Sequence, residues 1–348
     1  MKTTRNSAWP RFTCLMLAIC LVAIGHVGLA AEPADAAACA AIANDRERLE
    51  CYDAVAKRGQ AKPGTEPFQQ LGAAPAPKAA PGAVQPTALS VRWELDPETK
   101  QGPWVLRPQQ PLFILPVRYT NKPNESPQTP AHALTSAVPL DNTEAEFQLS
   151  FKIKAAENLF GNHADLWFGY TQQSQWQLYN GDISRPFRET DYQPEMFLLY
   201  PVRYELLGLT GRFVNLGLVH QSNGRSDPLS RSWNRIYAQF GFERGNFVLL
   251  VRPWYRLKEN PADDDNPDIE KYLGQGDVTA IYQSGRQQFS LLGRLNAGHG
   301  AAQGTWSFPI QQRLMGYVKL FSGYGETLID YNWSQTTAGL GILLVDWL

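Results

Sequence analysis

The sequence predicts an all-β fold, a twelve-stranded antiparallel transmembrane β-barrel with a small N-terminal periplasmic extension. Three observations predict it. The chain begins with the parts of an export signal, and from about residue 112 onward apolar and polar residues alternate with a period of two. Charged residues make up only 19% of the 348 residues and aromatic residues make up 11%, a composition that is typical of outer-membrane barrels.

The N-terminus has the composition of a cleavable signal peptide. Lys2 and Arg11 precede an apolar stretch over 12–29, which ends in small residues. A charged start, an apolar centre and a small-residue end are the parts of a secretory signal. The alternative, an uncleaved membrane anchor, is disfavoured because the apolar run is short and is interrupted by His26. We therefore predict export, with residues 1–30 as the signal peptide.

Two cysteines remain after export. Cys39 and Cys51 lie in a small element over 31–56, in an oxidising compartment that permits a disulfide. Their spacing suits a short helical hairpin closed by one bridge, and two free thiols are the alternative. The next part, 57–110, begins as a linker rich in Ala, Pro and Gly, which cannot bury enough apolar surface to fold. The end of this part, 88–110, is ambiguous.

The barrel domain is predicted over 111–348. In 214–219 one parity is aliphatic, whereas the other carries Asn215 and Gly217. At about 20 residues for each strand and its loop, the domain has room for about twelve strands, an even number as such barrels prefer. A soluble β-sandwich is the alternative, but its interior is apolar, while here the second parity is polar or rich in glycine. Other segments with this alternation are 166–172, 235–240, 247–252, 289–295, 317–321 and 340–345.

The charge balance argues against nucleic acid as a partner. The chain has 32 Lys and Arg residues against 33 Asp and Glu residues, a formal net charge of −1. Nucleic-acid binding needs a basic surface to contact phosphates, and this composition does not predict one. With only 4 Cys residues, a disulfide-dense scaffold and a four-cysteine zinc site are also disfavoured.

One predicted hairpin carries the residue types of a nucleophilic site. His220 and Ser222 continue the aliphatic parity of their strand, and residues two apart on a strand project to the same side. If the hairpin is symmetric about a turn near Asp227, Asn234 lies opposite His220 on that face. A serine needs a base to become a nucleophile, and a histidine needs a third group to fix its tautomer. The alternative is a polar loop collar above the edge of the bilayer.

Four long segments of the chain match one known family. Two of them are HQSNGRSDPLSRSWNR over 220–235 and YTQQSQWQLYNGDISRPFRETDYQPEMFL over 170–198. The others are PWY at 253–255, followed by DDDNPD at 263–268, and SGYGETLIDYNWSQTTAGLGILL over 322–344. These segments resemble the outer membrane phospholipase A family, a phospholipase A1 family. The resemblance covers about residues 110–348 without a large gap.

The resemblance implies a twelve-stranded barrel in the Gram-negative outer membrane, with its active site on the outer wall. It implies a calcium-dependent hydrolase that cleaves acyl esters of glycerophospholipids and lysophospholipids, with A1, A2 and lysophospholipase activities. Carried over by position, Ser222 is the nucleophile, His220 is the general base, and Asn234 orients the imidazole. The backbone N–H of Gly224 belongs to the oxyanion site.

The resemblance also implies a Ca²⁺ site and a homodimer. Ser230 would bind through its hydroxyl, Arg225 through its backbone carbonyl, and Ser184 would come from the neighbouring subunit. Asp265 matches a further acidic position of the metal site, and oxygen ligands of this kind suit Ca²⁺. Without the resemblance, the acidic run around Asp265 is more often a solvated loop. Gln172 matches the dimer contact of the family.

Overall fold

The structure, a computed structural model, describes residues 39–55, 86–296, 298–312 and 314–348. The chain divides into two compact units, Met1–Ala76 and Pro77–Leu348, and each is described by itself. The predicted signal peptide over 1–30 lies outside the described residues, as does the first part of the predicted linker.

The described part of the first unit is a helix tied by a disulfide. Helix α3 spans Asp45–Val55. Cys39, which precedes it, is bonded to Cys51 within it, and their Cα atoms lie 5.6 Å apart. The bridge is therefore present, which decides between the two alternatives that the spacing left open. A unit too small to bury a sizeable core gains stability from such a cross-link.

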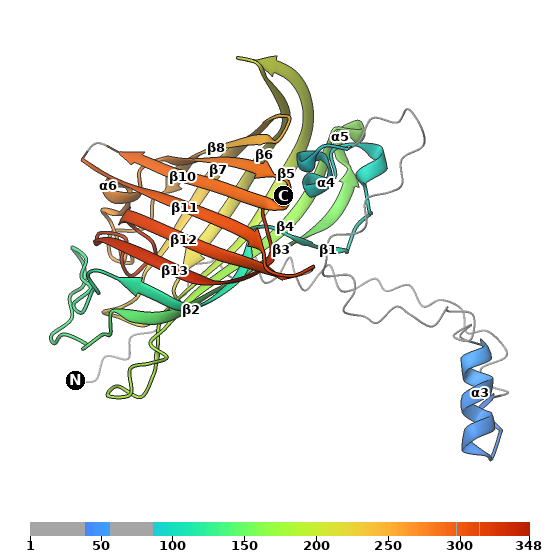
Figure 1. The fold of residues 1–348 in the computed structure, drawn as a ribbon, viewed down its shortest axis with the longest axis horizontal. Helices are drawn as coiled ribbons and strands as arrows, with labels where there is room; N and C mark the ends of the chain where they lie inside the picture. The colour runs from blue at the N-terminus through green and yellow to red at the C-terminus, as the bar shows by residue number, and fades with distance from the viewer. Residues whose placement is uncertain (1–38, 56–85, 297, 313) are drawn as a thin grey trace. The chain divides into compact units, whose positions relative to one another are not determined.

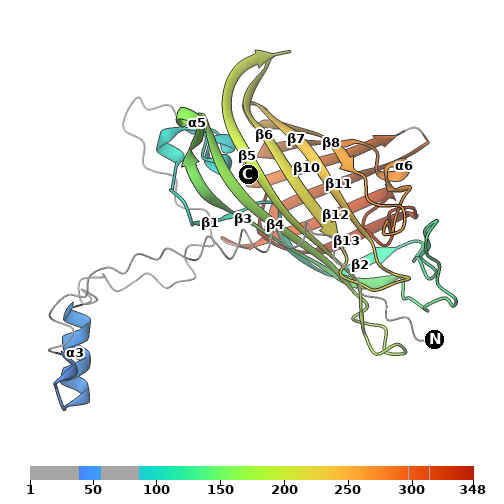
Figure 2. The same ribbon diagram turned by 180° about the vertical axis from the view of Figure 1, so that it is seen from behind.

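The described part of the second unit contains thirteen strands, of which twelve close into a barrel (Figures 1 and 2). Strands β2 to β13 pair antiparallel with their neighbours in sequence, and β13 pairs with β2 to complete the circle. The short strand β1, Leu106–Pro108, pairs with β3. The twelve strands are β2 (Leu112–Thr120), β3 (Thr143–Asn158), β4 (Ala164–Trp176), β5 (Phe187–Leu206), β6 (Leu209–Ser222), β7 (Ser232–Arg244), β8 (Phe247–Leu257), β9 (Gly276–Ser284), β10 (Gln287–Asn296), β11 (His299–Pro309), β12 (Met315–Tyr324) and β13 (Ser334–Val345). The predicted fold class is confirmed.

The connections differ between the two ends of the barrel. At one end the chain turns tightly, at Gly245 between β7 and β8 and at Gly285 between β9 and β10, both with a positive φ that favours glycine. Most connections at the other end are long loops, among them 121–142, 223–231 and 258–275. Short turns at one end and long loops at the other are typical of outer-membrane barrels.

The residues before the barrel fill the short-turn end of its lumen. Helix α4, Ala88–Trp93, begins at Thr87, whose hydroxyl accepts a hydrogen bond from the Ser90 N–H. The Trp93 ring lies 4.7 Å from the Phe213 ring, and the Lys152 ammonium lies 3.2 Å from the Trp93 ring centroid. The segment 88–110, which the sequence left ambiguous, is therefore ordered by the contacts of Trp93 inside the barrel and by the pairing of β1 with β3. The remaining short helices are η3 (Pro97–Thr99), α5 (Leu159–Asn162) and α6 (Ile269–Leu273).

No helix in the described part of the chain is long and apolar enough to cross a membrane.

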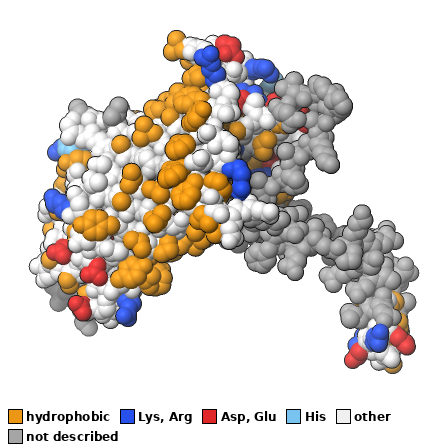
Figure 3. Space-filling model, in the orientation of Figure 1, with side chains coloured by type: hydrophobic (Ala, Val, Ile, Leu, Met, Phe, Trp, Pro, Cys, Tyr) orange, Lys and Arg blue, Asp and Glu red, His pale blue; other side chains and the backbone are white. Residues whose placement is uncertain are grey.

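Burial along the strands alternates as the predicted parity requires. On β6, Asn215 and Gly217 are buried, whereas Leu216 is 50% exposed. A Cβ at Gly217 would lie 2.5 Å from the Tyr237 ring, so any larger residue at this inward position would require Tyr237 to move. Figure 3 shows hydrophobic side chains spread widely over the outer wall of the strands. Apolar residues outside and polar residues inside are the arrangement of a membrane barrel, not of a β-sandwich.

The lumen contains a buried network of charges. Arg118 contacts Glu144 and Glu326. The Lys319 ammonium lies 2.5 Å from Glu146 and 3.1 Å from Glu326. Buried charges are costly unless they are paired, and these pairs link β2, β3 and β12 to the loop after β12. The network packs the polar interior across the barrel.

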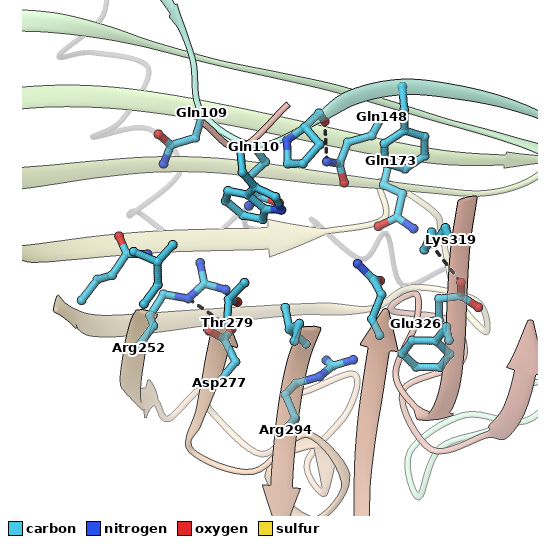
Figure 4. Close-up of a pocket in the computed structure, with 18 of the residues that line it drawn as sticks. Gln109, Gln110, Gln148, Gln173, Arg252, Asp277, Thr279, Arg294, Lys319 and Glu326 are labelled. Atoms are coloured by element: carbon cyan, nitrogen blue, oxygen red, sulfur yellow. Dashed lines mark hydrogen bonds and ion pairs between the residues drawn. The ribbon is translucent and has the colours of Figure 1, made fainter. Parts of the chain in front are cut away.

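A cavity of about 160 Å³ lies beside this network (Figure 4). It is a space inside the lumen, and no residue of the predicted triad lines it. Its lining includes Gln109, Arg252, Asp277, Arg294 and Lys319.

Candidate active site

The hairpin of β6 and β7 assembles the residues of the predicted triad. His220 pairs with Asn234, and Ser222 pairs with Ser232, which is the register that the symmetric hairpin predicted. His220, Ser222 and Asn234 belong to the outward parity of their strands and are partly exposed. Neighbours on one face of a strand pair are close enough for direct side-chain contact. The three groups therefore share one patch of the outer wall, at the long-loop end.

His220 and Asn234 are joined by a hydrogen bond. The Nδ1 of His220 lies 2.8 Å from the Oδ1 of Asn234. Since an amide oxygen only accepts, Nδ1 carries the proton and Nε2 is free to take one. Among the described residues, no hydrogen bond joins Ser222 to His220. In substrate-free catalytic sites such contacts are often long and tighten when the substrate binds.

Asn223 holds the loop that follows Ser222. Its Nδ2 donates to Glu189 Oε1 at 3.0 Å and to the Leu229 carbonyl at 2.8 Å. Its Oδ1 accepts from the Arg231 N–H at 3.0 Å. Asn223 is buried, so these bonds are made away from water. A single amide thus joins the two ends of the loop to β5.

Gly224 continues this loop in a conformation that favours glycine, with φ +63°. A Cβ added there would lie 3.1 Å from the Tyr192 ring. Tyr192 is also the residue of β5 that pairs with Ser222. Its ring therefore borders both Gly224 and the surface around the Ser222 hydroxyl.

The predicted dimer contact, Gln172, lies in the same outward row as the predicted nucleophile. Gln172 on β4 pairs with Tyr192, which pairs with Ser222. The Gln172 amide accepts from the Tyr170 hydroxyl at 3.0 Å and donates to the Ser174 hydroxyl at 3.3 Å. An amide group has further hydrogen-bonding capacity beyond these two bonds. A partner that covers Gln172 would also border the surface beside Ser222.

Two of the predicted calcium ligands meet above the strands. The Ser230 hydroxyl donates to Asp265 Oδ2 at 2.6 Å. His132 Nε2 lies 3.4 Å from Asp265 and 3.5 Å from Asp227. The possible ligand atoms of His132, Asp227 and Asp265 lie within 4.8 Å of one another. Hydroxyl and carboxylate oxygens are ligands that Ca²⁺ prefers, so Ser230 and Asp265 fit this ion.

The other two predicted calcium ligands have different surroundings. The Arg225 guanidinium donates to the Arg188 carbonyl at 2.6 Å, which fixes the side chain. Ser184 lies in the turn between β4 and β5, where its N–H donates to the Gly181 carbonyl at 3.2 Å. Among the described residues, no hydrogen bond links Ser184 to Ser230 or Asp265. Of the four predicted ligands, Ser230 and Asp265 are the pair that a hydrogen bond joins among the described residues.

Sequence reasoning missed Glu259, which contacts Asn234 of the predicted triad. The Nδ2 of Asn234 donates to Glu259 Oε1 at 2.9 Å. Burial and the nearby Asp264 raise the pKa of the Glu259 carboxyl, while Arg256 acts in the opposite direction. A signal was present, because Tyr255, Leu257 and Glu259 share one parity and a carboxylate there continues an outward row.

Asn223 and His132 were also missed, and they had no comparable signal. Both lie in long loops, where side-chain direction follows no period. Only the folded loops show that Asn223 points toward β5 and that His132 meets Asp265.

Comparisons of sequence find relatives along most of the chain. The sequence model of the family described as phospholipase A1 matches residues 89–344. A protein described as putative phospholipase A1 from Neisseria meningitidis serogroup B is 40% identical over 345 residues, which is 88% of this chain and 90% of the relative. Phospholipase A1 from Escherichia coli K12 is 44% identical over 205 residues, which is 58% of this chain and 70% of the relative.

Comparisons of structure agree with those of sequence. Outer membrane phospholipase A from Escherichia coli matches with a TM-score of 0.64 and 38% identity, over 70% of this chain and 95% of that chain. The Salmonella typhi outer membrane phospholipase, described as a dimer with bound calcium, matches with a TM-score of 0.66 and 36% identity, over 74% of this chain and 98% of that chain.

Proposed function

This chain belongs to the phospholipase A1 family, and from this premise we propose how it works. It is a β-barrel of the Gram-negative outer membrane and a lipid-ester hydrolase. We propose that it hydrolyses acyl esters of glycerophospholipids and lysophospholipids, with A1, A2 and lysophospholipase activities, in a Ca²⁺-dependent reaction of a homodimer. The observation that carries this proposal is the 2.8 Å contact of His220 with Asn234, beside Ser222 on the outer wall.

In the proposed reaction, Ser222 is the nucleophile. Its Oγ attacks the ester carbonyl carbon while the hydroxyl proton moves to His220 Nε2. Asn234 keeps accepting from His220 Nδ1–H, which holds the imidazole in place. The oxygen of the tetrahedral intermediate accepts from the Gly224 N–H. His220 then gives its proton to the leaving alcohol oxygen, the ester bond breaks, and water releases the acyl group from Ser222 by the same steps.

The proposed metal site lies between two copies of the chain. Ser230 through its hydroxyl, Arg225 through its carbonyl and Asp265 through its carboxylate would hold Ca²⁺, together with Ser184 of a second copy. Bound Ca²⁺ would supply positive charge that stabilises the developing oxyanion. The oxygen ligands around Ser230 and Asp265 support this assignment, as does the calcium-bound dimer of the Salmonella typhi relative.

The proposal includes the domain organisation. Residues 1–30 are the signal peptide, 31–56 form the small element with the cysteine pair, and 57–110 connect it to the barrel. Residues 111–348 form the phospholipase domain, which the outer membrane surrounds.

Fatty-acid release from phospholipid vesicles tests the proposed function. The parent chain and Ser222→Ala are compared, each with Ca²⁺ and each with a chelator. Of the four reactions, only the parent chain with Ca²⁺ is expected to release fatty acid. The reaction needs both the Ser222 nucleophile and the positive charge that stabilises the oxyanion. Release by Ser222→Ala near the parent rate would remove the triad from the proposal, and equal release with chelator would remove the metal.

A further inference from the structure

Glu259 extends the row of polar groups that begins at the proposed nucleophile. Asn234 pairs with Leu257, the last residue of β8, and Glu259 follows two positions later on the same parity. The carboxylate thus reaches Asn234 diagonally across the strand pair, where Oε1 accepts from Asn234 Nδ2 at 2.9 Å. Asn234 in turn accepts from His220 at 2.8 Å. Three groups therefore form one chain of hydrogen bonds that ends at His220, which lies two residues before Ser222 on the same outward parity of β6.

We propose that Glu259 is a positioning residue that selects the catalytic tautomer of His220 through Asn234. This inference rests on the proposed function, because it concerns the base of the same reaction. Glu259 does not touch His220 in any hydrogen bond of the described residues, so its action passes through the Asn234 amide.

The argument follows from which atoms can donate. An ionised carboxylate only accepts, so Glu259 pairs with the NH₂ end of Asn234. The amide oxygen must then face His220, and it accepts only if Nδ1 carries the proton. Nε2 is then unprotonated and can accept the Ser222 proton. With the amide turned the other way, the proton would sit on Nε2, and a histidine in that tautomer cannot act as the base.

The charge of Glu259 adds a second effect. In triads with an aspartate, a negative charge next to the histidine stabilises the imidazolium that forms in the transition state. Asn234 is neutral and cannot do this alone. Glu259 places a negative charge next to Asn234, on the side away from His220. Its carboxylate is half-buried, and electrostatic effects are stronger there than in water. Arg256, Asp264 and Asp265 are the other charged groups that act on this carboxylate.

Kinetics of three variants and the parent test the proposal on the full chain with phospholipid vesicles and Ca²⁺. Glu259→Ala is expected to lower kcat about 10- to 100-fold, as loss of a hydrogen bond to a charged group predicts, with KM within about twofold of the parent. Glu259→Gln, which keeps the shape and an acceptor, is expected to lie between the parent and Glu259→Ala. Lys258→Ala is the control, because Lys258 is the adjacent residue of the same loop and its side chain is exposed. Its kcat and KM should match those of the parent. Parent-like kcat in Glu259→Ala would overturn the proposal.

A double-mutant cycle separates positioning from a general structural role. If Glu259 acts through Asn234, adding Glu259→Ala to Asn234→Ala lowers kcat no further. If the double variant instead loses kcat by the product of the two single losses, the two residues act independently and the proposal is overturned. Nitrogen-15 NMR of labelled histidine, with His220→Ala to identify the signal, should show the proton of His220 on Nδ1 in the parent and shared between both nitrogens in Glu259→Ala. An unchanged tautomer would likewise overturn it.

These tests distinguish this inference from the proposed function. Activity that survives Ser222→Ala contradicts the triad itself. An inactive Ser222→Ala together with a fully active Glu259→Ala contradicts only the role of Glu259. Heat-modified gel mobility of each variant, compared with the parent, checks that the barrel is folded in every comparison.

Discussion

At the scale of single residues, the proposed triad lies on the outer wall of the barrel, where its side chains are partly exposed. Neighbouring strand positions such as Leu216 and Ile236 are exposed hydrophobic residues, as expected of a lipid-facing surface. A His, a Ser and an Asn on such a surface are costly without partners. The contacts of Asn234 with His220 and with Glu259 give both His220 and Asn234 a hydrogen-bond partner.

Asn234→Ala is expected to damage the reaction less than Ser222→Ala does. Without Asn234, His220 still has a nitrogen that can act as base, although its tautomer and orientation are no longer held. Ser222→Ala removes the nucleophile itself. Single-turnover kinetics on phospholipid vesicles, with Ca²⁺ present, measure both losses. Equal losses would show that Asn234 does more than orient the imidazole.

At the scale of elements, the loop between β6 and β7 carries two of the four proposed metal ligands, Arg225 and Ser230, without contributing to the closure of the barrel. Its strands are paired to their ends, and Asn223 ties the loop to β5. We expect Ser230→Ala, or chelation of Ca²⁺, to remove activity while the barrel stays folded, because the ion is proposed to act on the oxyanion. Heat-modified gel mobility in chelator tests the fold. Loss of the folded band would mean that the metal is structural.

Helix α4 contributes to stability from inside the barrel. Trp93 is buried among Phe197, Phe213 and the Lys152 ammonium. Trp93→Ala is expected to cost about 3–5 kcal/mol, the usual loss when a buried tryptophan is truncated. Urea unfolding followed by tryptophan fluorescence and gel mobility measures the change. Val91→Ala is the control on the same helix, because Val91 is 51% exposed. Equal unfolding midpoints would show that α4 is not part of the barrel core.

At the scale of the whole molecule, the proposed dimer couples calcium binding to association. Ser184 would come from a second copy, so dimerisation would add a ligand and raise the affinity for Ca²⁺. By thermodynamic reciprocity, Ca²⁺ should strengthen the dimer by the same factor. In detergent, Ca²⁺ with substrate is expected to shift monomer to dimer. Gln172→Ala should weaken this shift by about 1 kcal/mol, the size of an interhelical polar contact in membranes.

Analytical ultracentrifugation with and without Ca²⁺ measures this shift. Gln287→Ala is a matched control, since Gln287 lies on β10, far from β4 in the strand order, and its amide accepts from Trp306. A purely monomeric species that is active at saturating Ca²⁺ would contradict the coupling.

The sequence by itself determined the barrel and the alignment of His220 with Asn234. Both follow from the two-residue period of strands, which assigns each side chain to a face, and from the symmetry of a hairpin. Glu259 lies two residues beyond the end of β8 and continues its outward parity, but the sequence was read as a strand only to residue 252. Tertiary structure alone decided that α4 enters the lumen, that Cys39 bonds to Cys51, and that His132 meets Asp265. These contacts join segments outside the strand ladder, and no local period determines where such segments pack.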